Sequence, residues 1–263
     1  MATVVIDGKK VRVKKGATIL DAARKAGIWI PTLCHHPAVS NPATCRLCMV
    51  EVERGDRRQL VTSCNYPVRG DVVVHVSSER AVRARQGVMK LLLARAPESE
   101  PLRKLAARMD VHGTPYPSVT ESQRNCVLCG LCTAVCEEVI GRAAIGFAGR
   151  GVERAVATPF RLPSDACIAC GACAAVCPVG TIQVRIHAET NEAEISPFKS
   201  RVKLLVCEGC GKRIVSEPLA TQILKNAELD WEEFRKRARL CTECRRKVTA
   251  AALAASSAEA GEM

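Results

Sequence analysis

Cysteine is the residue type in this chain best suited to chemistry, and its spacing is regular. The chain has 263 residues and 16 cysteines, and every cysteine falls into one of four groups of four. The groups are Cys34, Cys45, Cys48 and Cys64; Cys126, Cys129, Cys132 and Cys136; Cys167, Cys170, Cys173 and Cys177; and Cys207, Cys210, Cys241 and Cys244. Four thiolates complete the coordination of a zinc ion or an iron–sulfur cluster. The count therefore predicts four metal centres.

A disulfide framework is the alternative interpretation of so many cysteines. Such frameworks belong to short secreted chains whose small cores need covalent support. This chain is long enough for roughly two or three domains with cores of their own. Its first residues, MATVVIDGKK, lack the features of a signal peptide, and no apolar stretch is long enough to span a bilayer. We therefore expect a cytoplasmic protein whose thiols stay reduced and bind metal.

The net charge changes once metal is counted. The formal value is +12, which by itself would suggest a nucleic acid or an acidic membrane surface as partner. Metal-bound cysteines are thiolates, and four of them around zinc or an iron–sulfur core leave roughly −2 per centre. Four such centres reduce the net charge to about +4. Aromatic residues make up only 3% of the chain, too few for base stacking, so we expect no nucleic-acid partner.

The second and third groups repeat one spacing. Each reads C-x2-C-x2-C-x3-C, and the later copy is followed by Pro178. This is the bacterial four-iron run, in which the fourth cysteine ligates the other cluster. We expect one [4Fe–4S] cluster on Cys126, Cys129, Cys132 and Cys177, and another on Cys167, Cys170, Cys173 and Cys136. The first copy has Glu137 where proline is usual, a departure that affects loop shape more than ligation.

The first group resembles the plant-type two-iron pattern, although its first gap is ten residues and not four. The stretches Ile30-Pro-Thr-Leu-Cys34, Thr44-Cys45-Arg46-Leu-Cys48-Met-Val-Glu51 and Ser63-Cys64 resemble the [2Fe–2S] domain that begins the large iron–sulfur subunit of respiratory complex I. The same domain occurs in the diaphorase iron–sulfur subunit of NAD-linked hydrogenases and in NAD-dependent formate dehydrogenases. The resemblance extends over about residues 1–187. It implies a [2Fe–2S] cluster on Cys34, Cys45, Cys48 and Cys64, and a flavin-bearing, NADH-oxidising partner.

One departure from the resembling proteins concerns a missing cluster. They commonly carry a His-x3-Cys-x2-Cys-x5-Cys site just after the helix expected here at residues 80–96. In this chain the segment from Ala94 to Arg103 has no cysteine, and His75 and His112 stand alone. The resemblance therefore implies that the two-iron centre passes electrons more directly to a four-iron centre or to a cluster of the partner.

The last group is ambiguous in its ligand. Two C-x2-C hooks are the spacing of a closed four-cysteine zinc site, and Gly209 and Gly211 permit a tight turn at the first hook. We expect one zinc ion on Cys207, Cys210, Cys241 and Cys244. A further iron–sulfur cluster is the alternative, and an empty site is a third. Because zinc is redox-silent, it would make this module a structural dock.

The local patterns predict the elements that position these groups. Asp7-Gly8 between two apolar runs predicts a hairpin, and Thr18 with Asp21 predicts a helix start. Strands are expected near residues 49–53, 59–62, 72–76 and 181–186, and another leads into Cys207. Helices are expected at 79–96, with its arginines facing solvent, at 101–109 and at 218–238.

These signals predict the α+β fold class and five segments. Residues 1–78 are expected to form a β-grasp [2Fe–2S] ferredoxin-like domain, and residues 79–117 a helical linker without the one-His, three-Cys cluster. A bacterial-type 2[4Fe–4S] ferredoxin-like domain over 118–190 and a zinc-ribbon-like four-cysteine module over 200–248 follow. Residues 249–263 are expected to be disordered.

The sequence shows no substrate chemistry of its own, since it has no Ser-His-Asp pattern, P-loop, Rossmann fingerprint or spare cysteine nucleophile. We expect a non-catalytic iron–sulfur relay subunit of a cytoplasmic multi-subunit oxidoreductase. It would link an NADH/flavin subunit to a catalytic partner such as a hydrogenase, a formate dehydrogenase or another low-potential reductase. One alternative is a free ferredoxin-like carrier. Another is a redox-sensing regulator that grips nucleic acid through its zinc ribbon and Arg245-Arg246-Lys247.

Overall fold

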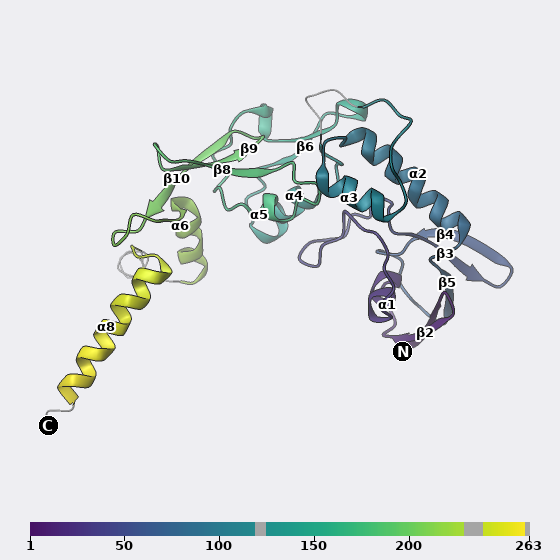
Figure 1. Cartoon of the computed structure of the whole chain (residues 1–263), viewed down its shortest axis with the longest axis horizontal. Helices are drawn as coiled ribbons and strands as arrows, with labels where there is room; N and C mark the ends of the chain where they lie inside the picture. The colour runs from purple at the N-terminus through teal and green to yellow at the C-terminus, as the bar shows by residue number, and fades with distance from the viewer. Residues whose placement is uncertain (119–124, 229–238, 261–263) are drawn as a thin grey trace. The chain divides into compact units, whose positions relative to one another are not determined.

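The computed structural model describes residues 1–118, 125–228 and 239–260 (Figure 1). The chain divides into two compact units. The first contains Met1–Ala157 and Ala172–Thr181, and the second contains Thr158–Gly171 and Ile182–Met263. The span expected to be one dicluster domain, residues 118–190, therefore contributes to both units.

A five-stranded mixed sheet forms the core of the first unit. Its order is β2-β1-β5-β3-β4, in which β1 and β5 are parallel and the other pairs are antiparallel. The strands are β1 Ala2–Ile6, β2 Lys9–Val13, β3 Met49–Arg54, β4 Arg57–Thr62 and β5 Val72–His75. Buried and partly buried residues alternate along β1 and β5, which shows that one face of the sheet is more tightly packed than the other.

The turn between β1 and β2 is the one expected at Asp7-Gly8. Both residues have positive φ, 45° and 83°, which is the conformation that a two-residue hairpin requires. The Asp7 carboxylate also accepts the backbone N–H groups of Val76 and Ser77. The hairpin is therefore tied to the residues that follow β5.

Helix α1 (Ile19–Lys25) begins with the expected capping box. The N–H of Asp21 donates to Thr18 Oγ1 at 3.1 Å, and the N–H of Thr18 donates to the Asp21 carboxylate at 3.0 Å. Ile19 and Leu20 are buried in the same hydrophobic cluster as Val4 of β1. This burial fixes the helix on the packed face of the sheet.

Helices α2 (Glu79–Arg95) and α3 (Glu100–Arg108) follow, each capped by a serine. The expectation that the arginines of α2 face solvent is wrong for Arg85. Its side chain is buried and donates to the carbonyl oxygens of Met49 and Val76, both at 2.8 Å. A guanidinium has several donors and can bond two carbonyls at once, so Arg85 ties α2 to the end of β3 and to the residue after β5.

The rest of the first unit consists of short elements around the cysteine loops. The segment Ala172–Thr181 joins this unit because Ser99 Oγ donates to the Val179 carbonyl at 3.0 Å and Thr181 Oγ1 donates to the Asn125 carbonyl. The elements are α4 Leu131–Ala134, the π-helical turn Val135–Val139, β6 Gly146–Ala148, the 3-10 turn Gly151–Glu153, β7 Ala155–Ala157 and α5 Ala172–Ala175.

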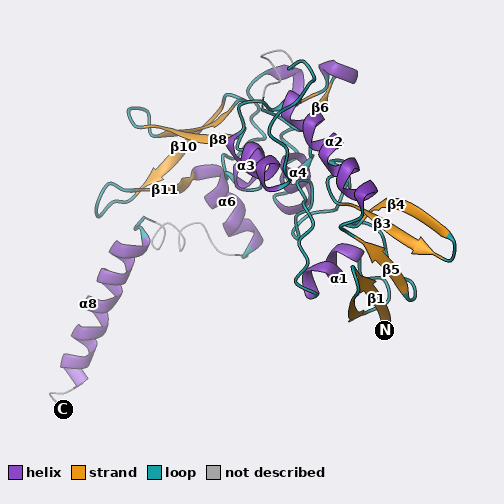
Figure 2. Ribbon diagram, turned by 45° about the vertical axis from the view of Figure 1, so that its right-hand side comes forward, coloured by secondary structure: helices purple, strands orange, loops and turns teal. Residues whose placement is uncertain are grey.

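The second unit is built on an antiparallel sheet of order β11-β10-β9-β8 (Figure 2). Its strands are β8 Gln183–His187, β9 Glu192–Ser196, β10 Ser200–Val206 and β11 Arg213–Ser216. Helix α6 (Glu217–Asn226) packs against β10 and β11 and buries Ala220 and Leu224. The 3-10 turn Pro159–Arg161 begins a segment that belongs to this unit. Two hydrogen bonds hold this segment to the sheet: the Ser164 N–H donates to Ser200 Oγ at 3.0 Å, and Ser216 Oγ donates to the Ile168 carbonyl.

The end of the chain differs from the expectation of a disordered tail over residues 249–263. Helix α8 runs from Thr242 to Ala260, because its alanines have the highest intrinsic helix propensity. The helix expected over residues 218–238 is observed as α6 up to Asn226, and residues 229–238 lie outside the described part of the chain.

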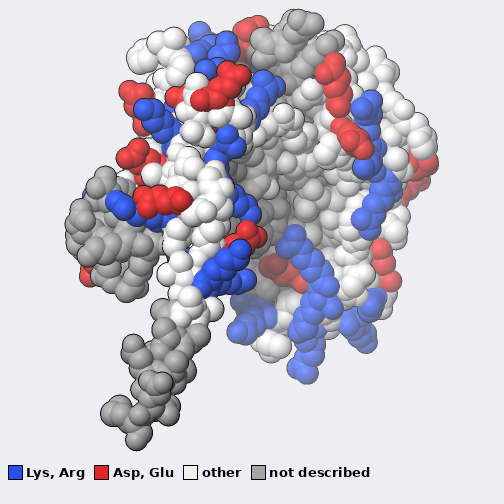
Figure 3. All heavy atoms as spheres, turned by 60° about the vertical axis from the view of Figure 1, so that its left-hand side comes forward, with Lys and Arg blue, Asp and Glu red and all other residues white. Residues whose placement is uncertain are grey.

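Two surface properties bear on function. Lys and Arg side chains gather toward the lower part of the face shown in Figure 3, as the formal net charge of +12 leads one to expect. Within the described ranges, no helix combines the length and the apolar character needed to cross a membrane.

Candidate metal centres

The first cysteine group lies in a buried loop of the first unit. Cys34, Cys45 and Cys48 precede β3, and Cys64 follows β4, so the two strands bring the distant ligand to the loop. All four side chains are buried, with exposed fractions between 1% and 7%. Arg46, between the second and third ligands, has a φ of 58°. This left-handed residue turns the chain tightly between Cys45 and Cys48.

The four thiols of this group form two pairs. Cys45 N–H donates to Cys34 Sγ at 3.4 Å, and the Cys45 thiol lowers the pKa of Cys34 to about 5 by hydrogen bonding to its thiolate. The Cys48 thiol likewise lowers the pKa of Cys64. A [2Fe–2S] core has two irons, each completed by two cysteines. The two thiol pairs therefore fit a [2Fe–2S] core. Cys34 and Cys45 would hold one iron, and Cys48 and Cys64 would hold the other.

The first four-iron motif forms a tight loop that leads into α4. Leu128 and Gly130, between its first three cysteines, have φ values of 51° and 81°. Burial raises the pKa of Cys129 to about 12 and also raises that of Cys132. A buried thiolate is stable only next to a compensating charge, and a bound iron cluster supplies one. These thiols would therefore stay neutral without metal, and the positive iron atoms of a cluster would have to stabilise their thiolates.

Cys177 lies close to this loop, as cross-ligation requires. Its negative charge raises the pKa of Cys126, Cys129 and Cys132, so its Sγ is within electrostatic range of all three. The bonds of Ser99 and Thr181 described above hold the segment of Cys177 against the first unit. The structure therefore brings together the four residues expected to hold one [4Fe–4S] cluster.

The two-iron group and the first four-iron motif are direct neighbours. Thr44 Oγ1 donates to the Cys129 carbonyl at 3.3 Å, and the charge of Cys34 contributes to the raised pKa of Cys129. Leu47, which is fully buried, belongs with Cys34 and Cys129 to one hydrophobic cluster.

The residues of the second four-iron motif are distributed over both units. Cys167 and Cys170 belong to the second unit, whereas Cys136 and Cys173 belong to the first. The assembly of these four residues around one cluster therefore stays a prediction. In the first unit, Cys136 Sγ accepts the N–H of Ala144 at 3.4 Å.

The loops of the two four-iron motifs nevertheless share one backbone conformation. Ala169 and Gly171, with φ values of 50° and 76°, hold the same places among their cysteines as Leu128 and Gly130. Adding a side chain at Gly171 would bring it within 3.3 Å of Val184. The repeat seen in the sequence is therefore also a repeat of loop shape.

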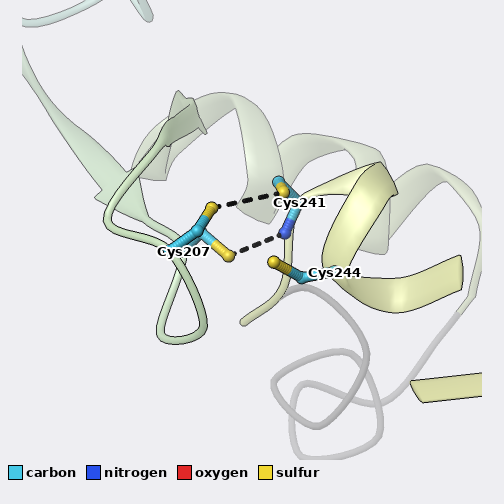
Figure 4. A group of neighbouring side chains, drawn as sticks. Cys207, Cys241 and Cys244 are labelled. Atoms are coloured by element: carbon cyan, nitrogen blue, oxygen red, sulfur yellow. Dashed lines mark hydrogen bonds between the residues drawn. The ribbon is translucent and has the colours of Figure 1, made fainter. Parts of the chain in front are cut away.

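The terminal group is the most compact of the cysteine sets. The sulfurs of Cys207, Cys210, Cys241 and Cys244 all lie within 4.8 Å of one another. Figure 4 shows Cys207, Cys241 and Cys244 converging on one point, with the Cys241 N–H donating to Cys207 Sγ at 3.2 Å. This bond lowers the pKa of Cys207 to about 6. A Cβ on Gly209 would lie 3.2 Å from Cys244 Sγ, so a larger residue there would crowd this sulfur.

The sulfur spacing of the terminal group indicates the size of its ligand. Zinc holds thiolates at about 2.3 Å in a tetrahedron, whose edge is then about 3.8 Å. Cys210 Sγ and Cys241 Sγ are 3.6 Å apart. A four-iron cubane places several metal atoms between its ligands and needs them farther apart. The site therefore fits a single metal ion.

Arg95 is a residue near these sites that the sequence analysis did not single out. It ends α2, and its Nε donates to the Cys126 carbonyl at 3.0 Å. Its place in the last turn of the expected helix was the available signal, but only the folded chain shows which cysteine it reaches.

Two family models match the chain. A "2Fe-2S iron-sulfur cluster binding domain" matches residues 1–79, and a "4Fe-4S dicluster domain" matches residues 125–181. The chain is thus an iron–sulfur protein with a two-iron domain followed by a four-iron dicluster domain. The terminal four-cysteine site lies beyond both matches, and its ligand is not assigned by them.

Several known oxidoreductase subunits are similar in sequence to this chain. The chain is 35% identical over 204 residues to an NADPH-Fe(3+) oxidoreductase subunit alpha of Geobacter sulfurreducens, covering 69% of this chain and 24% of the relative. It is 32% identical over 179 residues to the NADH-ubiquinone oxidoreductase 78 kDa subunit of Candida albicans, covering 59% and 25%. The NADP-reducing hydrogenase subunit HndD of Solidesulfovibrio fructosivorans is 36% identical over 190 residues, covering 62% and 32%.

A solved structure, a crystal structure of NAD+-reducing [NiFe]-hydrogenase in the H2-reduced state, matches with a TM-score of 0.53 and 28% identity. The match covers 60% of this chain and 74% of that one. The chain is therefore homologous to the N-terminal part of the 75/78 kDa subunits and to iron–sulfur subunits of the hydrogenase and NADPH-Fe(3+) oxidoreductase. It spans about a quarter to a third of the length of the curated relatives named above.

Proposed function

We propose that this chain is an iron–sulfur electron-relay subunit of a cytoplasmic, multi-subunit, NAD(H)-linked oxidoreductase. The observation that carries the proposal is the direct packing of the two-iron group on the first four-iron motif, through Thr44, Leu47 and Cys129. Buried metal centres packed side by side suit electron transfer, whereas a storage or structural role needs no such packing. The relatives, whose names describe NADH, NADPH and hydrogen chemistry, supply the class of complex.

The proposed route has three centres. When bound, iron–sulfur clusters take up and release single electrons. The chain accepts electrons at Cys34, Cys45, Cys48 and Cys64, in a domain that we assign to the β-grasp ferredoxins. It passes them to Cys126, Cys129, Cys132 and Cys177, and then to Cys136, Cys167, Cys170 and Cys173, as in a bacterial-type 2[4Fe–4S] ferredoxin. The cysteine-free segment after α2 fits a relay with one cluster fewer than the resembling proteins have.

The partners follow from the two ends of this route. We infer an NADH-oxidising flavin subunit at the two-iron domain, and a catalytic oxidoreductase subunit at the other end. The chain itself contributes no substrate chemistry, and no nucleic acid is needed. Each inference rests on what the relatives' names describe and on the homology, since the chain covers only a part of those proteins.

The terminal module completes the proposal as a zinc-bound dock outside the route. Its sulfur spacing fits one tetrahedral ion. Among the described residues of this module, the buried hydrophobic side chains besides the cysteines are Ala220 and Leu224 on α6, so metal binding would supply folding free energy that their burial alone does not.

The test of the relay uses the complex purified through a tag on this chain. Cys48→Ser should slow NADH-driven reduction of the four-iron clusters while flavin reduction continues. Cys210→Ser, in the proposed zinc site, is the matched control and should leave that rate unchanged in complexes that still assemble. Full electron flow in a Cys48→Ser complex shown to lack its two-iron cluster would refute the route.

A further inference from the structure

The loop from Cys167 to Cys170 is anchored by the serine that begins α6. Ser216 Oγ donates to the carbonyl oxygen of Ile168, and both residues are buried, each with an exposed fraction of 2%. Both belong to the second unit. Ser216 is also the last residue of β11, which pairs with β10, the strand that leads into Cys207. The second four-iron loop and the terminal four-cysteine site therefore share one scaffold.

The hydroxyl of Ser216 does not cap its own helix. Ser216 is the N-cap residue of α6, where a serine side chain usually accepts an N–H group of the first turn, but it makes no such bond. Ser78 and Ser99, the N-cap residues of α2 and α3, both do. Removing the Ser216 hydroxyl would therefore break the bond to the loop without removing a helix cap.

The peptide group between Ile168 and Ala169 is held in a strained turn. Ala169 has a φ of 50°, a left-handed conformation that is unfavourable for a residue with a Cβ. A positive φ at the third residue of a four-residue turn is typical of type II, whereas type I has a negative φ there, and the two types differ by a flip of the central peptide group. A flip would relieve Ala169 and turn the Ile168 carbonyl away from Ser216. The Ser216 bond therefore stabilises the observed orientation.

The orientation of this peptide group decides which polar atom faces the metal site. The peptide is planar and trans, so the Ala169 N–H points away from the side on which the Ile168 carbonyl meets buried Ser216. Cys167 and Cys170 are only partly buried, so the N–H side is the side left for a cluster. An N–H group near a cluster stabilises the negative charge that reduction adds, and a carbonyl oxygen in its place opposes that charge.

We propose that Ser216 is a positioning residue that holds the Ile168–Ala169 peptide group with its N–H toward the second [4Fe–4S] cluster and so raises the reduction potential of that cluster. The proposal rests on the cluster assignments of the proposed function. It gives the terminal module, which lies outside the electron route, control over a property of the last centre of the route. The competing role is purely structural, in which Ser216 only ties the loop to the sheet.

Two substitutions separate peptide orientation from simple tethering. Ser216→Ala removes the hydroxyl, and Ala169→Gly removes the strain that favours the flip, because glycine accepts a positive φ. Adding Ala169→Gly to Ser216→Ala should therefore restore the observed orientation, whereas a glycine would only loosen a loop that needs a tether. Thr221→Ala is the matched control, since Thr221 is exposed on α6 and its hydroxyl donates to the Glu217 carbonyl at 3.0 Å.

The measurement is an EPR-monitored redox titration of the anaerobically purified full chain. The signal of the second cluster is identified by its loss in Cys170→Ser. Ser216→Ala should shift the midpoint of this signal to a more negative potential, and the double variant should return it toward the wild-type value. Thr221→Ala should match the wild type. A midpoint in Ser216→Ala that is unchanged or more positive, or a double variant shifted as far as Ser216→Ala, would overturn the proposal.

Iron content decides the remaining outcomes. If Ser216→Ala loses the second cluster and the double variant keeps it, the orientation of the peptide group is required, which supports the proposal. If both variants lose it, Ser216 is only a tether and the proposal fails. A wild-type chain without a four-iron signal that depends on Cys170 would instead refute the proposed function.

Discussion

The two-iron group and the terminal group each have four cysteines, yet the two groups differ in burial and surroundings. The first is buried throughout, and its thiols form two pairs that fit two irons. The second gathers its sulfurs within 4.8 Å around one point and leaves Cys210 exposed. The first group also packs against another metal site, through Thr44 and Leu47. The comparison teaches that burial and neighbouring sites, more than cysteine number, distinguish the two groups, and under the proposed function they separate a redox site from a structural one.

The largest expected effect comes from removing one cysteine of the terminal site and, in a matched variant, one cysteine of the two-iron site. Cys207→Ala should abolish zinc binding and unfold the terminal module, because structural zinc contributes about 10–16 kcal/mol of binding free energy. The roughly ten iron atoms of the other groups should remain. Anaerobic metal analysis checks this, with Cys48→Ala as the matched variant that should lose iron and keep zinc. About fourteen iron atoms and no zinc in the wild type would erase the distinction between the two sites.

The next effect concerns cross-ligation. Cys177→Ala should eliminate the cluster on Cys126, Cys129 and Cys132, since Cys177 lies within electrostatic range of all three. EPR and Mössbauer spectra of the variant would show which cluster is lost. Loss confined to the cluster built on Cys167, Cys170 and Cys173 would contradict the arrangement.

A core substitution probes the junction between the two neighbouring sites. Leu47→Ala should lower the free energy of unfolding by about 2–5 kcal/mol, because it opens a cavity in a fully buried cluster. Thermal unfolding of the anaerobic holoprotein would measure the change. Leu162→Ala, at a side chain that is 62% exposed, should change stability by less than about 0.5 kcal/mol. Equal losses in both variants would mean that Leu47 is not part of a packed junction.

The smallest expected effect is at the start of α1. Thr18→Ala removes the side chain that accepts the Asp21 N–H, at a cost of about 1 kcal/mol. The same thermal measurement should show a small shift with full iron content. Thr190→Ala, whose hydroxyl donates only to an exposed glutamate, is the control. A loss of the two-iron cluster in Thr18→Ala would show that this helix does more than complete the fold.

Local signals predicted much of the fold. Neighbouring residues correctly indicated the hairpin at Asp7-Gly8 and the capping box of Thr18. They also indicated the bounds of α2 to within one residue. The four cysteine groups were equally visible, because metal ligands follow short spacings. Residues 249–260, for which disorder was expected, belong to α8, since alanine-rich stretches are helical by propensity, and residues 261–263 lie outside the described part of the chain.

What the sequence could not reveal depends on tertiary contacts. In the sequence, Arg85 resembles any other arginine of a surface helix. Only its hydrogen bonds to the carbonyl oxygens of Met49 and Val76 explain its burial. The contact of Arg95 with Cys126 spans 31 residues, and that of Thr44 with Cys129 spans 85. The division of the dicluster span between two units arises in the same way, from bonds of Ser164 and Ile168 to a distant sheet.

The matching left-handed residues of the two four-iron loops have a consequence for tolerance to mutation. Leu128 and Gly130 in one loop, and Ala169 and Gly171 in the other, have positive φ values. Glycine adopts this conformation at no steric cost, whereas a β-branched residue is strained in it. Replacing Gly130 or Gly171 with valine would therefore distort the backbone between the cysteines, and the same change should harm both halves of the repeat.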